Sequence, residues 1–139
     1  MTCPSLQSHP SEPVLIDTET FYAGFLLALA VQGTDAFSAD GKNFHEAFGL
    51  AIARARQLKN DVVVKDMDWM EMDPFYGVMP HAEELVAFGQ AARMLSLANP
   101  ELVKARIRYS KKDAEKALED IGHDEWFKEI AGVFKAHVK

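Results

Sequence analysis

The residues best suited to chemistry or binding are concentrated in the segment 66–79. It holds four of the six methionines, four carboxylates and three aromatic residues. Pro74 and Gly77 interrupt regular structure, so the pattern predicts a surface loop. Methionine adapts to irregular partner surfaces, and tryptophan and tyrosine are frequent binding anchors. We therefore predict a partner-docking segment made of Met67, Asp68, Trp69, Met70, Glu71, Met72, Phe75 and Tyr76.

The carboxylates of this segment favour a basic protein partner, because opposite charges steer association. An alternative leaves the carboxylates in solvent and packs the methionine and tryptophan side chains onto the end of the helical core. A metal site is not predicted. Counted from Asp66, the sixth and twelfth positions of an EF-hand loop would be Glu71 and Gly77, where that loop needs glycine and glutamate.

A row of basic residues marks a second candidate site. Lys104, Arg106 and Arg108 alternate with apolar residues, which is the two-residue period of a half-buried strand over 103–109. The row predicts either an edge strand protected by charge or a weak anion-binding face. Pairing with the acidic segment is a third interpretation. Tyr109 is expected on the opposite face, away from the cations.

The sequence gives little support for an enzyme. No glycine-rich phosphate loop or Gly-x-Ser-x-Gly motif occurs, and the histidines are isolated. We predict no catalytic residue, metal ligand or cofactor. The leading hypothesis is a small acidic, non-enzymatic protein-binding or regulatory domain, such as an adaptor, an inhibitor or an immunity-type factor. The alternative is a helical ligand-binding domain or enzyme whose pocket between helices uses Asp68, Glu71 or His81.

The elements that must position these residues are mostly helices. A polar leader over 1–13 precedes a single domain over 14–139, and 139 residues suit one domain. Apolar spacing and capping residues predict helices over 18–32, 43–59, 80–99, 111–121 and from 124 onward, where Asp124 is the expected cap. Strands are expected near 62–65 and 103–109, while 14–16 fits either a short strand or a hydrophobic entry to the first helix. The predicted fold is mainly α, a five-helix bundle-like domain with a small β element (α+β).

The first predicted helix is apolar on every face across Phe21–Val31, which is typical of a buried central helix. Gly24 and Ala28 would let another helix approach closely, and a homodimer through this helix is the alternative. Eleven apolar residues are too few to cross a bilayer. A single cysteine and the lack of a signal-like start favour a cytoplasmic protein. The net charge of −6 argues against a nucleic acid or an anionic membrane as partner.

Overall fold

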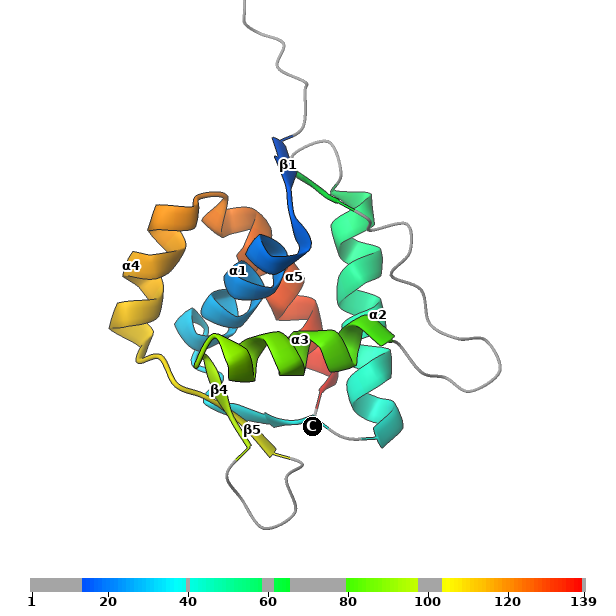
Figure 1. The fold of residues 1–139 in the computed structure, drawn as a ribbon. Coiled ribbons are helices and arrows are strands. Elements are labelled where there is room, and N and C mark those ends of the chain that lie inside the picture. The colour runs from blue at the N-terminus through cyan, green and yellow to red at the C-terminus, as the bar shows by residue number, and fades with distance from the viewer. Residues whose placement is uncertain (1–13, 40, 59–61, 66–79, 98–103, 139) are drawn as a thin grey trace, which may run out of the picture.

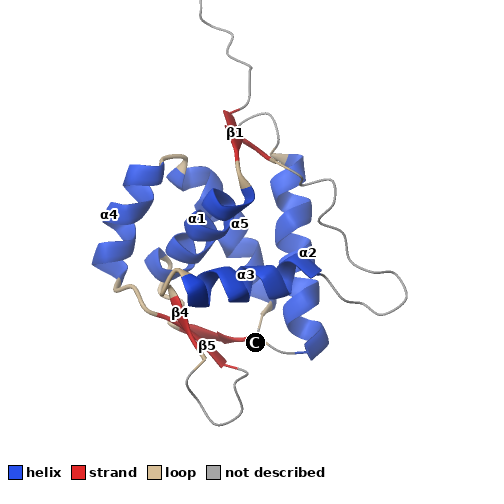
Figure 2. Ribbon diagram, viewed as in Figure 1, coloured by secondary structure: helices blue, strands red, loops and turns tan. Residues whose placement is uncertain are grey.

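The computed structural model describes residues 14–39, 41–58, 62–65, 80–97 and 104–138. Its helices are α1 (Thr18–Val31), α2 (Gly41–Gln57), α3 (Pro80–Ala91), α4 (Lys111–Ile121) and α5 (Asp124–His137). Short strands lie at two ends of this helical body (Figures 1 and 2). The predicted fold class, mainly helical with a small β element, is confirmed. Within the described residues, no helix is long and apolar enough to span a membrane.

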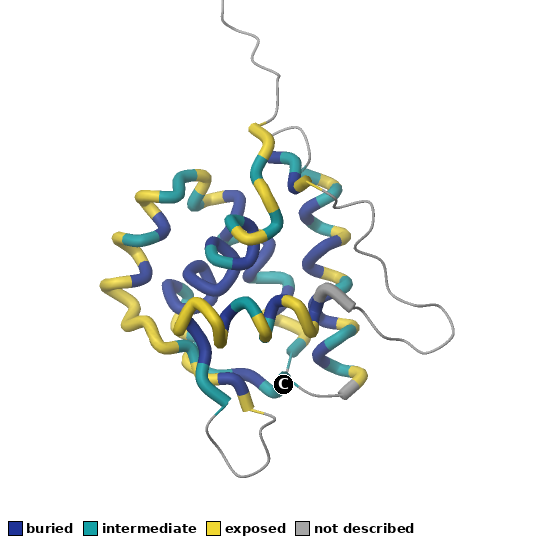
Figure 3. Tube along the Cα trace, in the orientation of Figure 1, coloured by how far each residue is buried: buried dark blue, intermediate teal, exposed yellow. Residues whose placement is uncertain are grey.

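Helix α1 occupies the centre of the fold. Asp17 caps it, because the Asp17 carboxylate accepts a 2.7 Å hydrogen bond from the backbone N–H of Thr20. The helix packs against α3, α4 and α5, and nearly all of its residues from Phe21 to Val31 are buried (Figure 3). Burial within one chain accounts for its apolar composition, while homodimerisation through it stays a prediction.

The approach of α5 to α1 depends on Gly24. A Cβ atom at this position would overlap the ring of Phe127 on α5, so a larger residue would force the helices apart. The neighbouring core is aromatic: the Phe134 ring lies 5.1 Å from that of Phe25 and 5.2 Å from that of Phe37, in edge-to-face geometry. The predicted close helix contact at Gly24 therefore forms within the chain.

The strands form two separate sheets. Strand β1 (Val14–Ile16) pairs in parallel with β3 (Val62–Val64). Strands β2 (Ala36–Ser38), β5 (Lys104–Ile107) and β4 (Leu95–Ser96) form an antiparallel sheet in that order. The predicted strands near 62–65 and 103–109 are present but belong to different sheets. Strands β2 and β4 were not predicted.

Helix α3 ends earlier than its apolar spacing predicts. It stops at Ala91, and Arg93 adopts a left-handed conformation with φ 61°. The backbone N–H of Met94 then bonds to the oxygen of Gly89 at 2.7 Å, which closes the helix end. The chain turns here into β4. Leu95 consequently lies in a strand instead of on the buried face of the helix.

Two further predictions about boundaries are wrong. His123, and not Asp124, is the N-cap of α5; its φ is 57° and its side chain makes no capping hydrogen bond. Gly122 and His123 both have positive φ, so the chain turns there and Asp124 is already helical. The strand predicted over 103–109 ends earlier, at Ile107, so Tyr109 lies beyond the alternation that placed it opposite the cations, and it is 37% exposed.

Candidate functional site

The predicted docking residues lie outside the described part of the chain. They are Met67, Asp68, Trp69, Met70, Glu71, Met72, Phe75 and Tyr76. His81 belongs to α3, but its side chain is likewise not described. Docking through this segment, and a pocket built from Asp68, Glu71 or His81, therefore stay predictions.

The basic residues of β5 are described, and their alternation is as predicted. Lys104 and Arg106 are exposed, whereas Ala105 between them is fully buried. Arg108 lies one residue beyond the strand; it is also exposed, and its backbone N–H donates to the oxygen of Met94 at 2.9 Å. The strand thus directs two of the three predicted cations to the outer face of the sheet.

The register of the sheet leaves Arg106 uncovered. Its partner in β2 is Ala36, and its partner in β4 is Ser96, so small residues flank it on both sides. Lys104 is likewise opposite a small residue, Ser38. Paired residues on adjacent strands share one face of the sheet. β5 is thus the central strand of its sheet, and the interpretation of the basic row as a charge-protected edge strand is wrong; its two exposed cations lie beside short side chains.

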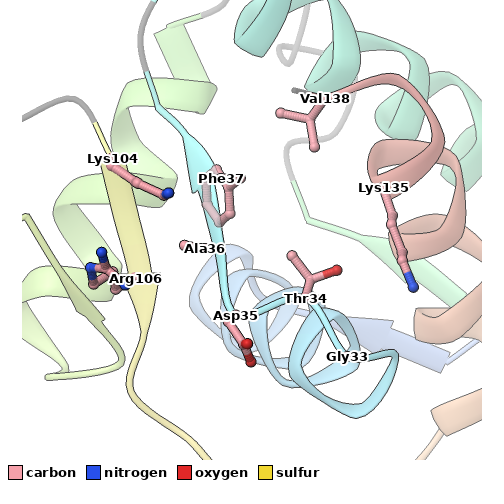
Figure 4. Close-up of a pocket in the computed structure, with 9 residues that line it drawn as sticks. All are labelled: Gly33, Thr34, Asp35, Ala36, Phe37, Lys104, Arg106, Lys135 and Val138. Carbon is pink, nitrogen blue, oxygen red and sulfur yellow. The ribbon is translucent and has the colours of Figure 1, made fainter.

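Next to these cations lies an open groove of about 480 Å³. Its lining residues are Gly33, Thr34, Asp35, Ala36, Phe37, Lys104, Arg106, Lys135 and Val138. Figure 4 shows Lys104 and Arg106 on β5 at one side of β2, with Lys135 of α5 at the other side. Three cations and one carboxylate therefore line one groove, where the formal charge is positive although the chain as a whole is acidic.

The groove residues differ in the partners that they have. The Lys135 ammonium group donates a 2.6 Å hydrogen bond to the backbone oxygen of Gln32. Among the described residues, the Arg106 guanidinium and the Asp35 carboxylate each take part in no ion pair. The hydroxyl oxygen of Thr34 is buried and has no hydrogen-bond partner there. The groove thus contains an exposed cation, an exposed carboxylate and a shielded hydroxyl.

Sequence reasoning identified only part of this groove. Lys104 and Arg106 were found through their alternation, whereas Arg108 does not line the groove. Asp35 and Lys135 were missed because they come from a loop and from the last turn of α5, 100 positions apart. No local pattern in the sequence connects two such residues.

A second hollow of about 270 Å³ lies between α4 and α5. Its lining includes the carboxylates of Glu115, Glu119 and Asp124, and the Lys128 ammonium lies 3.8 Å from Asp124. This is an interhelical pocket, but its residues differ from those predicted. Throughout the described part of the chain, no group of three or more histidine, cysteine or acidic residues is arranged to hold a metal ion.

The groove beside β5 combines an accessible guanidinium with further positive charge, an arrangement that suits an anionic ligand. No family model, curated protein or solved structure matches the chain.

Proposed function

We propose that this domain binds a small anionic molecule, bearing a phosphate or carboxylate group, in the groove beside β5. The observation that carries the proposal is the position of Arg106. It stands exposed on the central strand between Ala36 and Ser96 and makes no ion pair with any described residue. A guanidinium group binds phosphate and carboxylate through two parallel hydrogen bonds.

The surroundings of Arg106 strengthen the proposal. Lys104 and Lys135 line the same groove and raise its positive potential. A volume of about 480 Å³ falls in the range of small-molecule sites. Phe37 and Val138 add apolar lining, as small-molecule sites commonly have. The net charge of −6 makes a nucleic acid a poor candidate for this ligand.

The proposal is tested by calorimetric titration of the full chain with orthophosphate and with citrate at low salt. We expect Arg106→Gln to weaken the binding of either anion at least tenfold. The matched control is Lys116→Gln, which removes one positive charge from the exposed face of α4, away from the groove. It should change the affinity less than twofold. Absence of binding to the wild-type chain, or equal weakening by both variants, would refute the proposal.

We also propose that the methionine- and tryptophan-rich segment 66–79 docks a protein partner, because its composition favours such a contact. Four methionines, Trp69 and Tyr76 beside four carboxylates support docking to a basic protein. Together the two proposals describe a non-enzymatic binding or regulatory domain.

The docking proposal is tested with the double variant Trp69→Ala and Met70→Ala. Capture of a basic partner at low salt should be lost in the double variant, while the thermal midpoint should stay nearly unchanged. A midpoint several degrees lower would assign these side chains to the core instead. Partner release by high salt would identify the carboxylates as contributors to the contact.

A further inference from the structure

We infer that the ligand of this groove carries hydroxyl groups in addition to its anionic group, as a sugar phosphate does. The inference rests on the proposed anion binding and extends it to a ligand class. It starts from Asp35, a carboxylate that lines the same groove as Arg106.

The backbone fixes Asp35 beside the basic strand. Its carbonyl oxygen accepts a 2.7 Å hydrogen bond from the N–H of Ile107, the residue after Arg106. The next residue, Ala36, is the register partner of Arg106. Figure 4 shows Asp35 just before β2, next to Thr34, with its carboxylate pointing to the bottom of the view and Arg106 across β2 on β5. The acidic and basic groups are therefore held in one groove by the sheet itself.

Asp35 is exposed and forms no ion pair with any described lysine or arginine, although three cations line its groove. A carboxylate in this position repels a bare phosphate ion. An ionised carboxylate accepts hydrogen bonds but cannot donate them, so Asp35 favours a ligand that offers hydrogen-bond donors. The combination of Arg106 and Asp35 therefore suits a molecule with an anionic group at one end and donors at the other.

The charge of the groove indicates which donor is favoured. Three cations and one carboxylate leave a formal charge of +2 among the lining residues. This excess favours a ligand with net negative charge over a zwitterion, whose ammonium group the lysines would repel. Hydroxyl groups donate without adding positive charge.

The test compares the affinities of the full chain for orthophosphate, ribose 5-phosphate, ribose and serine by calorimetry. The wild-type chain should bind ribose 5-phosphate at least tenfold more tightly than orthophosphate. In Asp35→Ala, which removes the acceptor oxygens, this preference should fall to less than threefold, through weaker binding of the sugar phosphate. Asp120→Ala removes an exposed carboxylate from α4 outside the groove and should leave the preference unchanged. Thermal unfolding of each variant verifies that the fold is intact.

Four outcomes would overturn the inference. The first is equal wild-type affinity for orthophosphate and ribose 5-phosphate, which would leave the proposed anion binding standing. The second is an Asp35→Ala variant that binds both anions more tightly by the same factor, since Asp35 would then act only by repulsion. The third is tighter binding of serine than of ribose 5-phosphate, which would show that the groove prefers an ammonium group to hydroxyl groups as the donor. If neither anion binds the wild-type chain, the proposed function fails together with the inference.

Discussion

The ammonium group of Lys135 donates a 2.6 Å hydrogen bond to the backbone oxygen of Gln32, the residue at the C-cap of α1. The amide group of Gln32 in turn donates to the backbone oxygen of Lys128 at 2.7 Å. Helix α1 has no basic residue in its own last turn. Lys135 therefore supplies the positive charge that the C-terminal end of a helix favours.

Replacing Lys135 with methionine should lower the free energy of unfolding by about 1 kcal/mol, because a charge-assisted hydrogen bond to a helix end is lost. The measurement is urea unfolding at neutral pH. Lys116→Met, on the exposed face of α4, is the matched control and should change stability by less than about 0.5 kcal/mol. Equal losses in the two variants would show that the contact with Gln32 contributes nothing.

Two glycines in neighbouring helices should respond to alanine in opposite directions. A Cβ at Gly24 overlaps the Phe127 ring, whereas one at Gly132 lies 3.9 Å from the Gln32 amide nitrogen, an ordinary contact. Gly24→Ala should therefore cost about 1–3 kcal/mol through overpacking. Gly132→Ala should gain about 0.5–1 kcal/mol, because alanine is the better helix former. Thermal unfolding of both variants tests this, and a stabilised Gly24→Ala would contradict the packing of α1 on α5.

The helices were predictable because their signals are local. Ser110 accepts a 3.1 Å hydrogen bond from the backbone N–H of Asp113, and Gly122 ends α4 with φ 88°. Both residues lie within one turn of the helix that they delimit. Capping chemistry of this kind can be recognised in a single sequence.

The short strands and half of the groove were not predictable from local patterns. Strands β2 and β4 contain three and two residues, too few to show a pattern of their own, and both exist because they pair with β5; the partners Ala36 and Arg106 are 70 positions apart. The apolar spacing of α3 continues to Leu95, but the left-handed turn at Arg93 directs the chain into β4. Asp35 and Lys135 meet at the groove only through this tertiary arrangement.

The cap of α1 predicts a response to acid. The pKa of Asp17 is lowered from its usual value of 3.8, chiefly by hydrogen bonds from Thr20 to its carboxylate. A folded-state pKa below the unfolded value contributes stability above about pH 4, and this contribution is lost as the pH falls through the folded value. Asp17→Asn retains a capping oxygen that does not titrate in this range, so it should lose less stability than the wild type between pH 7 and pH 3.

Urea unfolding at pH 7 and pH 3 tests this response. Asp17→Ala should cost about 1 kcal/mol at pH 7, since it removes the cap. Glu19→Gln, at an exposed position in the first turn of the same helix, is the control and should keep the acid response of the wild type. Identical acid responses of Asp17→Asn and the wild type would show that the Asp17 carboxylate is not the group responsible.

Tyr22 predicts a response to base. It is 2% exposed, and burial raises the pKa of its phenol, with the negative charge of Glu84 and a side-chain hydrogen bond to Glu84 acting in the same direction. Above pH 10 the unfolded chain releases the phenolic proton while the folded chain retains it, so stability falls as the pH rises. At pH 11 this amounts to about 1 kcal/mol relative to pH 8, following the linkage slope of about 1.4 kcal/mol per pH unit.

The substitution Tyr22→Phe should remove this loss while costing about 1 kcal/mol at pH 8 through the hydrogen bond to Glu84. Tyr109→Phe is the control, because Tyr109 is 37% exposed. Urea unfolding at pH 8 and pH 11 should show a smaller alkaline loss for Tyr22→Phe than for either Tyr109→Phe or the wild type. If all three chains lose the same stability, the phenol of Tyr22 ionises as readily in the folded state as in the unfolded state. The burial of the Tyr22 side chain, which is the main cause of its raised pKa, would then not hold in solution.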